Sequence, residues 1–126
     1  MAPFAILPGG GGFVIHVSRL ATHTKDMMLS PAVSLLVVAP SPPGSSPQAT
    51  ARVTIQGQAQ PYPDSTPGHA EAKAAYLSRF PQTADLFSFA DFSLFVIRPT
   101  SVRFVGGFAQ ATTLDPAALA EILSNG

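Results

Sequence analysis

The sequence predicts an antiparallel β-barrel with short helices at its rims, in a single domain that covers residues 1–126. Three observations lead to this fold class. Five or six segments are short and rich in β-branched and other apolar residues, as strands are. Most of them follow one another through short turns, whereas a doubly wound sheet needs long helical crossovers. Only two or three segments have the pattern of a short helix.

Each strand prediction rests on an apolar run that ends at turn-forming residues. The first two strands form a hairpin around the turn 8–12, PGGGG, which lacks the features of a phosphate-binding loop. The run 33–39 is continuously apolar, which is typical of a strand covered on both faces. Residues 52–60 alternate between apolar and polar, which indicates one buried face. The predicted strands are 3–7, 13–17, 33–39, 52–60, 92–97 and 102–105, with a break at 99–101 between the last two.

The helix predictions rest on capping and stop signals. A helix over 22–29 ends before Pro31, because the residue before proline disfavours helical geometry. Thr66 and Asp115 are the expected N-caps of the other two helices, since each is followed by a proline that suits the first helical position. The second helix runs to about residue 80 and one further turn follows at 82–86. Its expected buried stripe is Ala70, Ala74 and Leu77.

The composition excludes several classes of function. Charged residues make up 11% of the chain, and seven Lys and Arg balance seven Asp and Glu. A protein that binds along the phosphate backbone of a nucleic acid needs a stripe of basic residues, which this chain lacks. The absence of cysteine excludes disulfides, thiolate zinc sites, iron–sulfur clusters and cysteine nucleophiles.

So few charges favour a homodimer, because a subunit that buries one face in a partner needs fewer of them. A monomer with a polar but uncharged surface is the alternative. Residues 1–7 are apolar but have no basic start and end at Pro8, unlike a signal peptide. The longest apolar run is too short to cross a bilayer, so the expected location is cytoplasmic.

The densest group of reactive side chains is residues 18–25, SRLATHTK, between a predicted strand and a predicted helix. Free backbone amides at the start of a helix attract anions, and hydroxyl and cationic side chains add further donors. The segment therefore predicts a phosphate site. The alternative is a helix cap within a solvated polar turn.

Arg52 is the second candidate, because it is the only charged residue between Asp26 and Asp64 and it begins the polar face of a strand. An arginine there suits a phosphate or the polar edge of a ring, although it also suits a plain strand end. The spacing of His16, His23 and His69 matches no metal-binding motif, so no metal ligand is predicted. As an alternative, His23 alone would serve as an axial haem ligand.

Three ordered motifs resemble the FMN-binding split-barrel flavoproteins related to pyridoxamine 5′-phosphate oxidase, and among them the haem-utilisation branch. The first spans 13–27, FVIHVSRLATHTKDM, and 30–36, SPAVSLL. The second is RVTIQG at 52–57. The third joins DFSLF at 91–95 with VRFVGGFAQA at 102–111. The resemblance covers nearly the whole chain.

The resemblance implies a dimer with two FMN sites at the subunit interface. By position, the side chains around the FMN phosphate would be Ser18, His23, Thr24 and Lys25. Arg52 would contact the flavin from the neighbouring strand. Family members have a helix and a full strand before the segment that resembles 3–7, so the barrel is expected to be short at its N-terminus. The position of Asp26 usually holds asparagine in the family.

Three functions remain open at this point. The first is an FMN-dependent oxidoreductase of the pyridoxamine 5′-phosphate oxidase type, in which the flavin supplies the chemistry and the protein positions it. Neither its substrate nor a catalytic acid or base follows from the residues. The second is a non-catalytic split-barrel protein that binds haem or no cofactor. The third is a haem-degrading enzyme.

Overall fold

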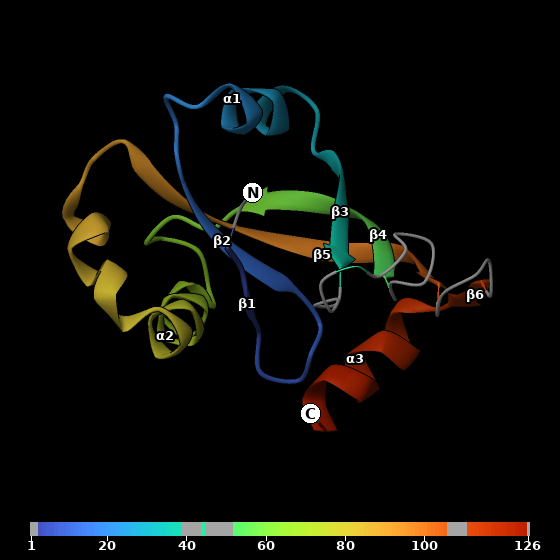
Figure 1. The fold of residues 1–126 in the computed structure, drawn as a ribbon. Coiled ribbons are helices and arrows are strands. Elements are labelled where there is room, and N and C mark those ends of the chain that lie inside the picture. Colours follow the sequence, from blue (N-terminus) through green and yellow to red (C-terminus); the bar gives the residue numbers. More distant parts are fainter. Residues whose placement is uncertain (1–2, 39–43, 45–51, 106–110, 126) are drawn as a thin grey trace.

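The computed structural model describes residues 3–38, 44, 52–105 and 111–125. Every strand pair in it is antiparallel, in the order β1-β2-β5-β4-β3, and β6 pairs with β5. Figure 1 shows the helices placed around this sheet, which confirms the predicted fold class. The elements are β1 (Ala5–Ile6), β2 (Phe13–Ser18), α1 (Thr22–Leu29), β3 (Ala32–Val38), β4 (Arg52–Pro61), α2 (His69–Arg79), η2 (Pro81–Ser88), β5 (Phe92–Val105), β6 (Ala111–Leu114) and α3 (Pro116–Asn125).

The glycine-rich turn closes the predicted hairpin between β1 and β2. Leu7 accepts a hydrogen bond from the N–H of Gly10 at 2.9 Å and donates its own N–H to Gly12 at 3.0 Å. Gly9 and Gly10 have φ angles of 86° and 73°, in the left-handed region that glycine enters without strain. The glycines therefore serve a turn between two paired strands.

The predicted break at 99–101 is wrong, because β5 runs without interruption from Phe92 to Val105. Pro99 lacks an N–H and would normally end a central strand. Here it pairs with Gly57, where the register between β4 and β5 shifts. The ladder is already irregular at this register shift, so it tolerates the missing N–H of the proline. One long strand can therefore pair with β2 at one end and with β4 along most of its length.

The predicted start of the second helix is also wrong. Gly68 has a φ angle of 93° and is the N-cap of α2, so Thr66 and Pro67 lie in the preceding turn. The buried stripe differs as well: Ala72 and Tyr76 face the sheet, while Ala70 and Ala74 are exposed. The later start changes which residues face inward. By contrast, α3 has its predicted cap, because the Asp115 carboxylate accepts the N–H of Ala118 at 2.7 Å.

The sheet buries apolar residues on both faces. One face forms the barrel interior, which Met27 of α1 and Leu119 of α3 help to close. The other face packs against Ala72 and Tyr76 of α2. Alternate residues of β2 point to the two faces, so Ile15 belongs to the interior and Val14 belongs to the α2 side.

The strand β3 lies at an edge of the sheet, and only one of its faces is covered. Val33 and Leu35 pack against the barrel interior, whereas Ser34 and Leu36 are exposed. The prediction that 33–39 is covered on both faces is therefore wrong for the single chain, because the described residues supply no second layer over the outer face.

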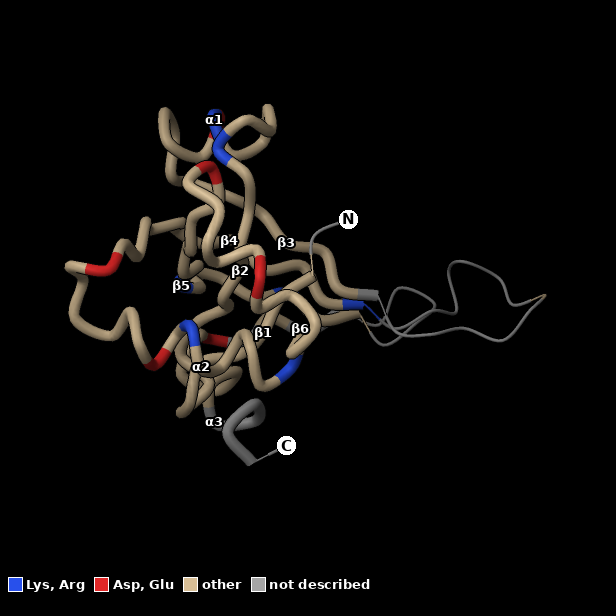
Figure 2. Tube along the Cα trace, turned by 90° about the vertical axis from the view of Figure 1, so that its left-hand side faces the viewer, with Lys and Arg blue, Asp and Glu red and all other residues tan. Residues whose placement is uncertain are grey.

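Charged side chains are sparse on the surface. Figure 2 shows them scattered along the described trace, with no continuous stripe of one sign. Among the helices in the described ranges, none is both long enough and apolar enough to span a membrane.

Candidate functional site

The predicted phosphate site, residues 18–25, lies where β2 leads into α1, and we call it the α1 junction. The Ser18 hydroxyl donates to the Asp91 carboxylate at 3.0 Å and accepts the N–H of Leu20 at 3.2 Å. Arg19 donates its guanidinium to the carbonyl of Ala90 and its backbone N–H to the carbonyl of Asp91. Two motifs that are far apart in the sequence are thus joined at one corner of the sheet.

The remaining residues of the α1 junction surround the start of the helix. His23 and Lys25 are exposed, while Thr24 is fully buried and its hydroxyl has no hydrogen-bond partner. The N-cap, Ala21, has no side chain that can cap the first amides. The helix start can therefore accept an anion, although Ser18 already uses its hydrogen on Asp91.

Arg52 lies far from the α1 junction within one chain. It begins β4 and pairs with Val38, while Ala32, next to α1, pairs with Gln58. The two ends of β3 are roughly 20 Å apart at about 3.3 Å per residue. The structure brings Ser18, His23, Thr24 and Lys25 together but does not bring Arg52 to them. The five predicted residues would share one site only if Arg52 came from a second copy of the chain.

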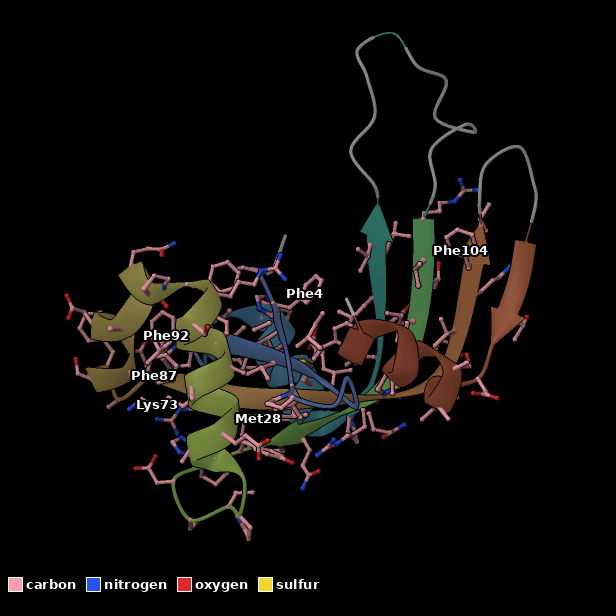
Figure 3. All side chains as sticks on the ribbon, turned by 90° about the horizontal axis from the view of Figure 1, so that it is seen from below. Phe4, Met28, Lys73, Phe87, Phe92 and Phe104 are labelled. Atoms are coloured by element: carbon pink, nitrogen blue, oxygen red, sulfur yellow. The ribbon has the colours of Figure 1, made fainter. Side chains whose placement is uncertain are left out.

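A larger candidate site lies between β2, β5, α2 and η2. It is a cavity of about 670 Å³, which we call the His16 cavity. Sites for small molecules and cofactors typically measure about 300–1,000 Å³. Figure 3 shows Phe92, Phe87 and Lys73 beside one another next to η2 and α2, with Met28 nearby. Its walls therefore combine aromatic rings with cations.

His16 is enclosed by aromatic rings on the α2 side of the sheet. Its imidazole stacks on Phe87 with a centroid distance of 3.8 Å and an angle of 7° between the planes. Tyr76 and Phe92 lie 5.8 Å and 5.3 Å from it, centroid to centroid. The residue is only 9% exposed, and its Nδ1 atom is buried without a hydrogen-bond partner. Such an unpaired buried group costs about 1–3 kcal/mol, so a partner for it would be stabilising.

The surroundings of His16 favour the neutral imidazole. Burial lowers the pKa of His16 below its ordinary value of 6.5, and the positive charge of Lys73 lowers the pKa further. Lys73 lies over the Phe87 ring that stacks on His16, with its Nζ atom 5.1 Å from the centroid of that ring. Because the lone pair of a neutral imidazole is free, His16 can accept a hydrogen bond or bind a metal.

We expect the free energy of unfolding to fall when the pH drops below about 6.5. With the pKa of His16 lowered in the folded state, the unfolded chain binds the proton more readily, so acid favours unfolding. The contribution of His16 to the free energy of unfolding is present above pH 6.5 and is lost as the pH falls toward the pKa of His16 in the folded state. Urea unfolding at about pH 7.5 and about pH 5.5 measures it. The His16→Phe variant should show a smaller difference than His23→Ala, and equal differences in both variants would contradict the assignment.

The charges around the His16 cavity are of both signs. Arg19 and Lys73 supply two cations. His69 pairs with Asp64, with 3.2 Å between Nε2 and Oδ1, but Asp64 is almost fully exposed, so this pair contributes little to stability. The cavity can thus hold a flat, largely apolar molecule that carries acidic groups.

The sequence predicts a site at Arg19, in the segment 18–25, but not at the other residues that line the His16 cavity. His16 was considered only for metal spacing, and Lys73 and Phe87 were not considered. One signal was present: a lone histidine interrupts the apolar strand FVIHV. The approach of α2 and η2 to this strand depends on tertiary packing, which no local pattern encodes.

Known proteins resemble the chain in sequence and in structure. No family model matches the sequence. The chain is 38% identical over 101 residues to the chloroplastic non-canonical heme oxygenase HOZ of Arabidopsis thaliana, a stretch that covers 80% of this chain and 29% of the plant protein. It is 35% identical to a heme binding protein from Mycobacterium smegmatis, with a TM-score of 0.81 over 95% of this chain and 48% of that one.

HutZ of Vibrio cholerae is 24% identical, with a TM-score of 0.68 over 78% of this chain and 68% of HutZ, which speaks for the fold alone. These similarities confirm the split-barrel fold, and the first two support the haem-utilisation branch that the motifs resemble. The chain spans less than half the length of the plant and mycobacterial proteins.

Proposed function

We propose that this chain is a haem-binding split-barrel protein of the haem-utilisation type. The observation that carries the proposal is its 38% and 35% identity to two haem proteins, over 80% and 95% of the chain. The α1 junction alone favours an anion but does not favour one cofactor over another. Since the chain spans only 29% of the plant oxygenase, the proposal extends to haem binding and not to the oxygenase reaction.

The residues of the His16 cavity fit a haem. A bare metal ion needs three or four protein ligands, and no group of three histidine or acidic side chains lies close enough among the described residues. A haem iron, by contrast, is already held by its porphyrin and needs only one or two ligands from the protein. Phe92 and Met28 add apolar surface to the lining, and Arg19 and Lys73 suit the carboxylates of a haem.

When bound, haem would supply oxygen or electron-transfer chemistry, according to its ligands and the polarity of its pocket. The chain's own residues would position it. Aromatic side chains would exclude water from its faces, and the two cations would fix the orientation of its acidic edge. The neutral imidazole of His16 lies in the wall of the site, and its buried Nδ1 atom has no hydrogen-bond partner.

FMN is the second candidate, and the start of α1 is the observation that favours it. The uncapped amides of this helix and the unpaired hydroxyl of Thr24 suit a phosphate. Two nearby carboxylates weaken the case for a phosphate, because their negative charge would repel it. Asp91 accepts a hydrogen bond from Ser18, and Asp26 lies on α1 itself. An oxidoreductase activity would follow only from FMN binding and a reductant.

Parallel titrations of the purified chain with hemin and with FMN test the proposal. We expect hemin to give a saturable Soret band at one haem per chain, and FMN to show little quenching of its fluorescence. Saturable FMN quenching without a Soret band would replace the first candidate by the second. If neither ligand binds, both candidates are refuted for this chain.

We further propose that two copies of the chain associate through α1 and β3. Leu29 at the end of α1 is 87% exposed, and Leu36 on the outer face of β3 is 63% exposed. Leu20, in the turn before α1, is also exposed. Exposed apolar side chains in three consecutive segments, beside an open strand edge, are features of an interface.

A further inference from the structure

We propose that the His16 cavity recognises cyclic tetrapyrroles by their flat apolar ring and their carboxylates, without a bond to the metal. A metal-free porphyrin should then bind there as well as haem does. This inference rests on the proposed function and widens its ligand class. Two observations carry it: no residue of the lining holds an iron-binding atom toward a ring in the cavity, and two cations in the wall have no acidic partner.

His16 lines the cavity but cannot ligate the iron of a porphyrin. The lone pair of an imidazole lies in the plane of its ring, so a porphyrin bound to it stands perpendicular to that plane, just beyond the ring edge. Phe87 stacks on His16 at 3.8 Å with only 7° between the planes, and it would lie in the path of such a porphyrin. Tyr76 and Phe92 enclose the same imidazole, and its Nδ1 atom is buried. His16 is therefore part of the wall.

The second histidine of the lining, His69, faces the rim of the cavity. Its Nε2 atom lies 3.2 Å from Oδ1 of Asp64, and the side chain of Asp64 is almost fully exposed. A porphyrin bound at this nitrogen would take the place of Asp64 on the solvent side. It would not lie in the space that the aromatic and cationic side chains line.

Two further residues of the lining, Tyr62 and Met28, are of types that can ligate haem iron, and neither is held in position for it. The Tyr62 hydroxyl accepts a hydrogen bond from Nη2 of Arg98 at 2.8 Å, and Arg98 lies outside the lining. Met28 is mostly exposed on α1, so its surroundings do not fix the place of its sulfur. Recognition by this cavity therefore depends on the ring and its substituents.

The cavity offers two cations for the carboxylates of a tetrapyrrole. Arg19 and Lys73 both line it, and within the described ranges neither forms an ion pair with an acidic side chain. The Nζ atom of Lys73 lies 5.1 Å from the centroid of the Phe87 ring, and this contact holds it at the wall (Figure 3). The guanidinium of Arg19 donates to the carbonyl of Ala90 and keeps further N–H groups available. Haem and its metal-free porphyrin carry the same two carboxylates, so these contacts do not depend on the metal.

Apolar side chains supply much of the remaining wall. Phe92, Leu94 and Phe95 of β5 line the cavity, which measures about 670 Å³. The favourable free energy of burial grows with the apolar area that is removed from water. The porphyrin ring presents this area with or without its metal, so we expect the two forms to bind with similar affinity.

Hemin and metal-free protoporphyrin IX, titrated in parallel into the full chain, test the mode of binding. We expect both to saturate at one molecule per chain, with dissociation constants within about threefold of each other. The dimethyl ester of protoporphyrin IX lacks the negative charges and should bind about fivefold or more weakly than the free acid. The Soret band follows hemin, and porphyrin fluorescence follows the two metal-free compounds.

A reversal of charge in the wall tests the site. Lys73 is half-buried on α2, and we expect Lys73→Glu to weaken the binding of hemin and of protoporphyrin IX alike, about fivefold or more. The matched control is Arg79→Glu, which makes the same change of charge in the last turn of the same helix, outside the lining. It should change both affinities by less than about twofold, because solvent and salt screen a distant exposed charge. Circular dichroism reports whether each variant is folded.

Hemin binding with protoporphyrin IX bound about tenfold or more weakly would reveal a bond to the iron, which overturns the inference but leaves the proposed function standing. The same holds if the dimethyl ester binds as tightly as the free acid, because the carboxylates are then not recognised. Equal affinities in Lys73→Glu and Arg79→Glu would overturn the assigned cavity. A parent chain that takes up no hemin would instead refute the proposed function.

Discussion

Replacing Gly57 with alanine is expected to lower the free energy of unfolding by about 3 kcal/mol, the upper end of the usual cost of overpacking. A Cβ atom at Gly57 would lie 2.6 Å from the carbonyl oxygen of Arg98 and 3.0 Å from Cγ2 of Ile97. The first of these is a backbone atom of β5 that cannot turn aside. Relief would require β4 and β5 to separate at the register shift that accommodates Pro99. Urea unfolding of the variant and the parent measures the loss.

The matched control is Gly11→Ala. A Cβ atom there would meet only the end of the Arg98 side chain, at 3.6 Å, which is an ordinary contact. We expect the free energy of unfolding of this variant to stay within about 1 kcal/mol of the parent value. Alanine can adopt the backbone conformation of this position without strain, so the substitution costs little. Equal losses in both variants would show that the close approach of β4 and β5 is not what requires glycine at position 57.

Local signals were enough to predict the parts of the fold whose ends are set by nearby residues. The first helix occupies 22–29 as predicted, because Ser30-Pro31 stops it whatever surrounds it. Asp115 caps α3 through a contact only three residues away. The hairpin of β1 and β2 likewise depends on its own turn.

One error arose where a distant segment overrides a local rule, and the other where a neighbouring glycine does so. Pro99 predicts a break, but Gly57, 42 positions earlier in the sequence, forms a register shift that tolerates it. Pro67 predicts a helix start, but the left-handed Gly68 delays it. The first compensation cannot be seen from the residues next to Pro99, whereas Gly68 directly follows Pro67 and is a local signal that the prediction missed.

The candidate site divides in the same way. The α1 junction could be predicted, because its polar residues are neighbours in the sequence. The His16 cavity could not, since His16 and Phe87 meet only after β2 pairs with β5 and η2 folds over the sheet. The role of Arg52 in a shared site remains a prediction that depends on a second copy.

The double variant Leu29→Asp and Leu36→Asp is expected to convert a dimer of the 13.1 kDa chain into a monomer. Each new carboxylate would be buried in the apolar contact that we propose. A loss of about 3 kcal/mol in the free energy of association raises the dissociation constant of the dimer more than a hundredfold. Both leucines are exposed in the single chain, so its folding should hardly change. Sedimentation equilibrium measures the mass, and Phe89→Asp, at an exposed apolar position outside α1 and β3, should remain dimeric. A parent that sediments as a monomer would contradict the interface.

The same double variant separates the two possible sites for the cofactor. The His16 cavity is lined by residues of one chain, so the monomer should keep the Soret band and the hemin affinity of the parent. A site that combines the α1 junction of one copy with Arg52 of another would come apart when the copies do, because roughly 20 Å along β3 separates these groups within a chain. Hemin titration of the monomer therefore decides between them. If the affinity falls together with the mass, the cofactor lies at the interface, and the arginine at the start of β4 reaches it from the second copy.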